Sequence, residues 1–420
     1  MRPVLKAALA PLWLDGGTLR LGTHPAYSLT YRLSPALRPL IDGLDGARDL
    51  DQLLDHVKRL GLDRADALAL LEQLARDGAL DDAANLPPAA DRLNRQNPAP
   101  KYPARDPDAH PHPALPGQAI AAGRTPRSGP VSGPVSGPVS GRASGPASGP
   151  GPALRPGPSP ASAPRSVRGR IAPDLAALGL RHRLPSGGQR AWERRSQRAV
   201  QVNGLGRVGT AIARTLAGCG VGTVVPVDPG PVGPTDLAPG GYRGKDLGRR
   251  RQDATCEALR DMSPEVHAAA SGYRPWWDMV IVAPADRHPV ELLVNLTREG
   301  TTHLLVETWP DRAALGPLVI PDRSPCSHCR DLARTEQDPG WPMVTAQLGR
   351  SDRPGARNGD TALSSLVAAQ AALHVLSYLD GGTPPSVNGY LEYPLPFGEP
   401  VRTDLSFHPA CGCAALPLVF

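Results

Sequence analysis

Four of the six cysteines in the chain form two tight pairs that lie far apart in the sequence. Cys326 and Cys329 stand in S-P-C-S-H-C-R, and Cys411 and Cys413 stand in H-P-A-C-G-C-A. Zinc binds four thiolates in a tetrahedron, and the free energy of binding can fasten the end of a chain to a distant segment. The pairs therefore predict a structural zinc site that folding brings together; four separate thiols are the alternative.

A glycine-rich turn, V-N-G-L-G-R-V-G at 202–209, contains Gly204, Gly206 and Gly209. In such a turn the first glycine lets a strand bend sharply, the second lets phosphate approach the backbone, and the third lets a helix pack on the strand. Asp228 ends the next expected strand, where a carboxylate can accept hydrogen bonds from ribose hydroxyls. The pattern predicts a nucleotide site; a nucleotide fold that no longer binds its ligand is the alternative.

The elements that must position these residues are apolar strands alternating with helices. We expect strands at 198–203, 221–228, 277–283 and 302–307, and helices at 210–218 and 360–379. Strands that alternate with helices indicate a parallel sheet. The sequence therefore predicts a Rossmann-like α/β domain over 166–420, with a mainly parallel sheet and the four cysteines near its end.

Residues 1–85 predict a small α+β domain that resembles a winged helix. A hairpin is expected at 11–22, and helical spacing of leucines predicts helices at 35–44, 50–60 and 64–77. Ten basic and twelve acidic residues give this segment a net charge near −2. A negative surface is poor for phosphate contacts, so the segment favours peptide binding over DNA binding.

Residues 86–165 predict a disordered linker, because the four-residue repeat at 129–141 (G-P-V-S-G-P-V-S-G-P-V-S-G) cannot bury a core. No acidic residue lies between Asp108 and Asp174, so the net charge of +6 falls largely on this segment. A solvated linker is favoured over a nucleic-acid-binding arm.

The sequence contains no stretch of eighteen apolar residues, so it predicts no membrane span. The first residues lack a convincing signal-peptide cleavage site. We therefore expect a cytoplasmic protein with reduced thiols, which favours metal over disulfides at the paired cysteines.

The glycine turn, V-D-P-G-P-V-G-P-T-D-L at 227–237 and the cysteine pairs together resemble the ThiF/MoeB/ubiquitin-activating superfamily. Its members bind ATP at the glycine turn and adenylate the C-terminal carboxylate of a peptide or small protein. The segments 316–334, 338–342 and 407–413 further resemble the ThiF-like cyclodehydratase partner proteins of thiazole and oxazole ribosomal-peptide (RiPP) biosynthesis. In that subfamily an N-terminal winged helix binds a precursor's leader peptide.

The resemblance implies roles for residues at matching positions. Gly204, Gly206 and Gly209 would hold the ATP phosphates, Asp228 the ribose, and Cys326, Cys329, Cys411 and Cys413 the zinc. Asp286, in A-P-A-D-R, falls close to the magnesium-binding aspartate of active members.

The chain departs from the superfamily at the Asn-Leu-x-Arg-Gln motif of adenylating members. Asp236 replaces the asparagine, and Ala238 with Pro239 replaces the arginine. Cations nearby that can substitute are Arg243, Lys245, Arg249 and Arg250. Phosphoryl chemistry needs such charges at fixed positions, so the sequence leaves open whether the chain is an enzyme.

The leading hypothesis is a peptide-recruiting protein that binds a precursor as an added strand and docks a separate YcaO-type cyclodehydratase. The alternative is an ATP-dependent adenylyltransferase, with Asp286 on magnesium and Arg243 or Lys245 on phosphates. A NAD-dependent oxidoreductase has only the glycine turn and Asp228 in its favour, and a DNA regulator conflicts with the negative charge of 1–85. The helix at 360–379 can supply a homodimer interface.

Overall fold

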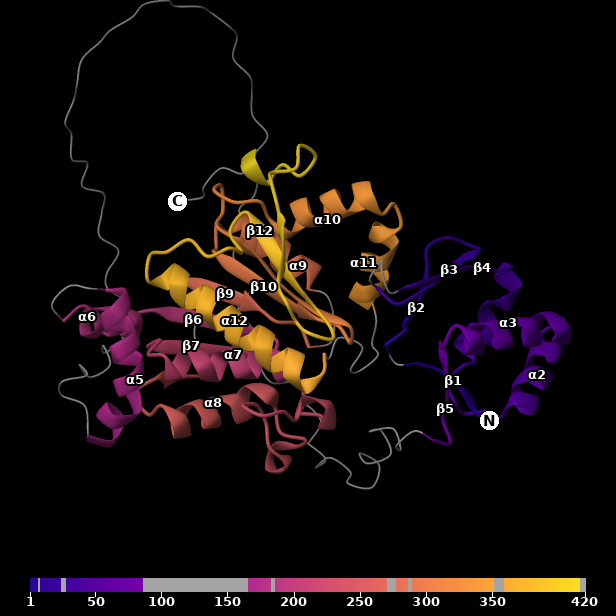
Figure 1. The fold of residues 1–420 in the computed structure, drawn as a ribbon, viewed down its shortest axis with the longest axis horizontal. Helices are drawn as coiled ribbons and strands as arrows, with labels where there is room; N and C mark the ends of the chain where they lie inside the picture. The colour runs from indigo at the N-terminus through magenta and orange to yellow at the C-terminus, as the bar shows by residue number, and fades with distance from the viewer. Residues whose placement is uncertain are drawn as a thin grey trace, which may run out of the picture. The chain divides into compact units, whose positions relative to one another are not determined.

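The structure, a computed structural model, describes residues 1–6, 8–23, 28–85, 165–182, 186–269, 277–285, 289–350 and 359–415. Met1–Gln96 and Pro156–Phe420 belong to one unit, and everything below concerns the described residues of this unit (Figure 1). The expected linker, apart from Arg165, lies outside the described residues. Asp286 does too.

An eight-stranded sheet forms the centre of the larger part of this unit, in the order β13-β12-β11-β10-β9-β6-β7-β8. The neighbours from β10 to β8 pair in parallel, whereas β10, β11, β12 and β13 pair antiparallel. The strands are β6 (Ala199–Asn203), β7 (Thr223–Val227), β8 (His267–Ala268), β9 (Met279–Val282), β10 (His303–Thr308), β11 (Arg312–Val319), β12 (Gly389–Pro394) and β13 (Val401–Asp404). The predicted α/β fold and its four strands are confirmed, and three antiparallel strands extend the sheet beyond the prediction.

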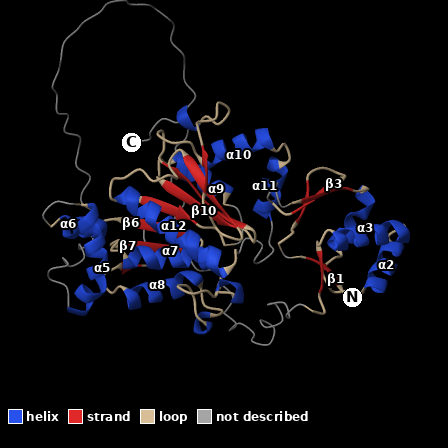
Figure 2. Ribbon diagram, in the orientation of Figure 1, coloured by secondary structure: helices blue, strands red, loops and turns tan. Residues whose placement is uncertain are grey.

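Helices cover both faces of this sheet (Figure 2). Alternate residues of β9 point to opposite faces: Ile281 packs in the core with α7 (Arg207–Gly218) and α12 (Thr361–Leu379), whereas Val280 packs with α9 (Val290–Arg298). Strands β10 and β11 are buried along their whole length, as expected of strands covered on two faces. Other helices of this part are α6 (Gly187–Ser196), α8 (Arg251–Met262), α10 (Ser327–Gln337) and α11 (Trp341–Arg350).

Helix α12 is long and apolar enough to cross a membrane by length and composition. More than half of its apolar window is buried, and Val367, Ala371 and Val375 pack in the core of the sheet. The side chain of Asp360 caps the first turn by accepting from the N–H of Leu363. We therefore describe α12 as a core helix.

Helix α5 (Arg165–Arg181) was not predicted by sequence pattern. It contains Pro173, and glycines lower its helix propensity further. Tertiary contacts stabilise it instead, because Ile171 and Leu178 pack against Trp192 of α6. Helix α6 is in turn held to the end of α12 by the guanidinium of Arg195, which donates to both oxygens of Asp380 at 2.9 and 2.6 Å.

The N-terminal part has two small sheets and a helical layer. Strands β1 (Pro3–Leu5) and β5 (Leu80–Asp82) pair antiparallel, and β2 (Pro11–Trp13), β3 (Thr18–Leu21) and β4 (Leu29–Arg32) form a three-stranded meander. The helices are α1 (Arg38–Asp42), α2 (Leu50–Arg59) and α3 (Arg64–Arg76). Asp49 and Asp63 cap α2 and α3, as the aspartate before each leucine-rich run indicates. The predicted hairpin and helices are observed, while the domain boundaries and the winged-helix assignment remain predictions.

Candidate functional site

The glycine turn joins β6 to α7 and is packed too closely for side chains at two positions. Gly204 has φ +84°, and a Cβ there would lie 2.1 Å from the carbonyl oxygen of Ala283. A Cβ at Gly209 would lie 1.9 Å from the carbonyl oxygen of Gly204. Gly206 is the N-cap of α7 and leaves its backbone bare at the helix N-terminus. Such a turn suits an anion that binds backbone N–H groups.

Asn203, the last residue of β6, has an unsatisfied donor beside this turn. Its Oδ1 accepts from Gln201 at 3.2 Å, but its buried Nδ2 has no acceptor among the described residues. A buried donor without a partner is costly, so a ligand atom at this edge of the sheet would satisfy it. Both features fit a bound nucleotide.

Asp228 lies at the turn, as predicted, but it is engaged by an arginine. Its Oδ2 accepts from the N–H of Leu205 at 2.8 Å and from Nη1 of Arg251 at 3.3 Å, and its Oδ1 accepts from Gly230. Nε of Arg251 donates at 2.9 Å to Asp236, whose side chain is 1% exposed. The buried guanidinium thus bridges two carboxylates beside the glycine turn.

Arg251 is a site residue that sequence reasoning missed. It is the third arginine of the run 249–251 and the first residue of α8, and it is the one that turns inward. The burial pattern distinguishes it, since Arg250 is exposed and Arg251 is buried. Sequence alone offered one signal, an arginine at the start of a helix, where acidic residues are usual.

Two of the other candidate cations, Lys245 and Arg249, have partners elsewhere. Lys245 lies 3.6 Å and Arg249 2.6 Å from the carboxylate of Glu257 on α8. The hydrogen bond from Arg249 lowers the pKa of that carboxyl below its usual value. Arg243 is exposed, and within the described parts of the chain neither Arg243 nor Lys245 has a polar contact with the glycine turn. The structure therefore brings Gly204, Gly206, Gly209 and Asp228 together, without these two cations.

The four paired cysteines meet at one point. Their Sγ atoms all lie within 4.8 Å of one another, with Cys326 3.4 Å from Cys411 and Cys329 3.4 Å from Cys413. A zinc tetrahedron with bonds of about 2.3 Å has sulfurs about 3.8 Å apart. The donor set and its dimensions therefore fit zinc.

The start of α10 positions two of these cysteines. Cys326 is the N-cap of α10, and Cys329 lies in its first turn. Hydrogen bonding from Cys326 lowers the pKa of the Cys329 thiol to about 4, so this sulfur favours the thiolate form that metals bind. The same hydrogen bond raises the pKa of Cys326, and burial raises the pKa of Cys413. His328 is exposed, and His408 contacts Glu336 through Nε2 at 3.0 Å; neither belongs to the cluster.

Helices α10 and α11 lead from the cysteine cluster to the three-stranded sheet. Asp338, the C-cap of α10, accepts from two nitrogens of Arg20 on β3 at 2.5 and 3.1 Å, which lowers the pKa of Asp338. Gln347 of α11 accepts from the N–H of Trp13 at 3.0 Å and donates to its carbonyl at 2.9 Å. The amide of Gln347 therefore occupies the outer edge of β2.

The opposite edge of that sheet presents backbone groups outward. The N–H of Leu33 donates to Gly17, so the alternation of an antiparallel ladder turns Tyr31 toward β3 and turns Thr30 and Arg32 away from it. Both outward residues are exposed, and no hydrogen bond to their backbone groups is found in the described ranges. This outer side of β4 is an open sheet edge.

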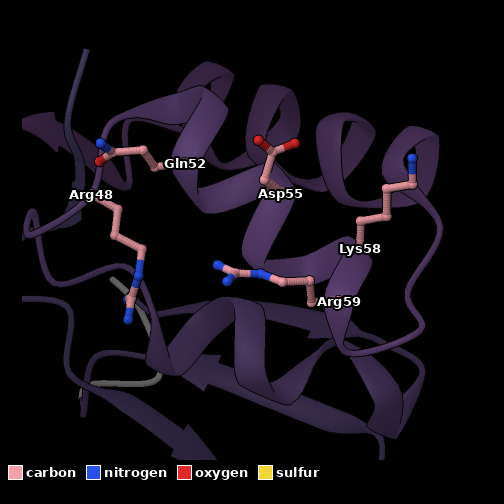
Figure 3. Close-up of a pocket in the computed structure, with 5 residues that line it drawn as sticks. All are labelled: Arg48, Gln52, Asp55, Lys58 and Arg59. Carbon is pink, nitrogen blue, oxygen red and sulfur yellow. The ribbon is translucent and has the colours of Figure 1, made fainter.

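A shallow hollow opens along α2, lined by Arg48, Gln52, Asp55, Lys58 and Arg59 (Figure 3). Three cations surround one carboxylate there, and Asp55 lies 3.5 Å from Arg64. Most of these side chains are exposed. Its five described lining residues include no nucleophile and no metal-ligand set, and the glycine turn and the cysteine cluster remain the candidate sites.

Comparison with known proteins places this geometry in a family. The model of the ThiF family matches residues 180–413, which include the glycine turn and all four clustered cysteines. No curated protein sequence matches the chain.

Solved structures with a similar fold are remote in sequence. Escherichia coli MccB with succinimide is 12% identical, with a TM-score of 0.48 over 99% of each chain. E. coli MccB with AMPCPP and the peptide MccA has the same identity, TM-score and coverage. PaaA is 18% identical, with a TM-score of 0.46 over 58% of this chain and 84% of its own.

Proposed function

This chain belongs to the ThiF family, and we propose that within the family it recruits a precursor peptide and presents it to a separate enzyme. The membership confirms the predicted superfamily. The enzyme we propose is a YcaO-type cyclodehydratase, because the segments at 316–334, 338–342 and 407–413 resemble its ThiF-like partner proteins. We place this function in the cytoplasm, where the clustered thiols stay reduced and bind zinc.

The observation that carries this proposal is the pair of unlike edges in the three-stranded sheet. Gln347 occupies the edge of β2, while the outward backbone groups of Thr30 and Arg32 on β4 remain available. A peptide that adds a strand gains affinity from main-chain hydrogen bonds and specificity from side chains on alternate faces. We therefore propose that the precursor pairs with β4.

Replacing Thr30 with proline is expected to weaken binding of a labelled precursor peptide about 10-fold or more, measured by fluorescence anisotropy. Proline removes the outward N–H, which is a main-chain donor for the added strand, and edge strands tolerate proline at such positions. Thr30→Ala keeps the N–H and is the matched control, expected to bind like the wild type. Equal affinity of the Thr30→Pro variant would show that the peptide does not pair with β4.

The second candidate is ATP-dependent adenylation of a peptide carboxylate. The bare glycine turn, the unsatisfied Nδ2 of Asn203 and the buried Asp228–Arg251–Asp236 bridge favour it. ATP would supply the adenylyl group, Gly206 and the first turn of α7 would hold phosphates, and Asp228 would orient the ribose. Arg251 keeps the two carboxylates from repelling the triphosphate.

ATP–pyrophosphate exchange tests this candidate. We expect exchange that the precursor peptide stimulates and that Asp286→Asn reduces at least about 100-fold, if Asp286 holds magnesium. Asp278→Asn, at a carboxylate that pairs with Arg198 at the start of β6, is the control and should retain exchange. No exchange in the wild type with any precursor would leave peptide recruitment as the function.

A further inference from the structure

Arg207 is the first residue of α7 and follows Gly206 directly. Its Nε donates to the carbonyl of Thr235 at 2.5 Å, and its Nη1 lies 3.4 Å from both the carbonyl of Gly359 and Oγ1 of Thr361. All three acceptors are neutral. Among the residues that the structure describes, no carboxylate pairs with this guanidinium, and Nη2 has no acceptor.

Arg207 lacks the carboxylate partners that Arg251, Lys245 and Arg249 have in the described parts of the chain. Arg251 is compensated by two carboxylates, and Lys245 with Arg249 by Glu257. No carboxylate among the described residues compensates the guanidinium of Arg207, which lies in the glycine turn and is partly buried.

The position is unfavourable for a cation unless an anion binds there. A helix N-terminus carries partial positive charge and normally attracts acidic residues, but the first turn of α7 has none. The neutral anchors of Arg207 come from the loop after β7 and from the start of α12, so they orient the guanidinium without neutralising it. An anionic ligand would relieve the repulsion between Arg207 and the helix end.

We propose that Arg207 binds the β- and γ-phosphates of a nucleotide at the glycine turn, in the role for which the sequence offered Arg243 and Lys245. The phosphates would gain a charge-assisted hydrogen bond from Nη2, in addition to the backbone N–H groups of the turn. This inference rests on the nucleotide-binding candidate of the proposed function, and it does not depend on peptide recruitment.

The test titrates the full-length protein with ATP and with AMP, in the presence of magnesium, by isothermal calorimetry. Arg207→Ala is expected to weaken ATP binding about 10-fold or more, the size of one lost charge-assisted hydrogen bond, and to leave AMP binding within about 2-fold. Arg214→Ala is the matched control: Arg214 lies two turns later on the same helix and also donates to a carbonyl, that of Gly241 at 3.2 Å. It should bind both nucleotides like the wild type.

Each other outcome is decisive. Unchanged ATP affinity in Arg207→Ala overturns the proposal and leaves nucleotide binding intact. An equal loss for ATP and AMP also overturns it, because it would show that Arg207 maintains the conformation of the turn and does not contact the β- and γ-phosphates. Wild-type protein that binds neither nucleotide overturns both this proposal and the adenylation candidate, while the peptide titration at β4 stands. If Arg207→Ala does not fold, Arg207→Gln keeps amide donors without the charge and should show the same selective loss.

Discussion

Replacing Cys413 with serine is expected to remove the zinc and to release the C-terminal segment from the sheet domain. Cys413 and Cys411 join Cys326 and Cys329 across the chain, and several residues between Leu405 and Cys413 are exposed. Few apolar contacts therefore hold this segment. Structural zinc contributes about 10–16 kcal/mol of apparent binding free energy in small zinc domains, so loss of one ligand has a large effect.

The zinc content of purified protein, measured by plasma mass spectrometry, should fall from about one ion per chain toward zero. Hydrogen exchange should accelerate in 405–415 and in the first turn of α10, because Cys326 caps that helix. Cys219→Ser is the control, since Cys219 is half-buried at the C-terminal end of α7 and lies outside the cluster. Full zinc content in Cys413→Ser would contradict a four-cysteine site.

Replacing Arg330 with methionine is expected to lower the free energy of unfolding by about 3–5 kcal/mol. Arg330 is 1% exposed, and its Nη1 donates to Glu307 at 2.9 Å and to the carbonyl of Gly316 at 3.3 Å. Methionine keeps much of the volume but leaves the carboxylate of Glu307, which is 2% exposed, without this cation. Removing one member of a buried ion pair costs far more than the pair contributes.

Urea unfolding followed by circular dichroism measures this change. Arg323→Met, in the exposed turn before α10, is the matched control and should shift the unfolding free energy by less than about 0.5 kcal/mol. Because Arg330 follows Cys329 directly, the zinc content of each variant should be measured as well. The double variant Arg330→Met with Glu307→Leu should recover much of the lost stability, since neither member of this ion pair is then left buried without the other. Equal changes in the free energy of unfolding at Arg330 and Arg323 would show that breaking the buried ion pair costs no more than removing an exposed arginine.

Helices α10 and α11 connect the cysteine cluster to the three-stranded sheet. Helix α10 begins at the cysteine cluster and ends at Asp338, which binds Arg20, and α11 holds the edge of β2 through Gln347. Arg334 lies over the ring of Trp341 at 4.9 Å and donates to Glu392 on β12. The cysteine cluster is therefore connected through α10 and α11 to the closed edge of β2, whereas β4 remains the open edge of the same sheet.

Much of the fold follows from local pattern in the sequence. Apolar runs such as W-D-M-V-I-V-A predicted buried strands, and leucines at helical spacing predicted α2 and α3, because burial needs one face in a helix and two in a covered strand. Glycines at 204, 206 and 209 and the two cysteine pairs indicated their positions. Only glycine suits the positive φ at Gly204 and the close backbone contact at Gly209, and only cysteine supplies four thiolates.

Tertiary structure alone decided which charges belong to the site. Arg243, Lys245 and Arg251 are all cations close in sequence, yet only the packing of α8 against the loop after β7 turns Arg251 inward and pairs Lys245 with Glu257. Likewise, nothing local in β2 reveals that Gln347, more than three hundred residues later, closes its edge. Sequence periodicity indicates which face of its own helix or strand a residue occupies. The partner of a charge or of a sheet edge depends instead on which distant elements come together.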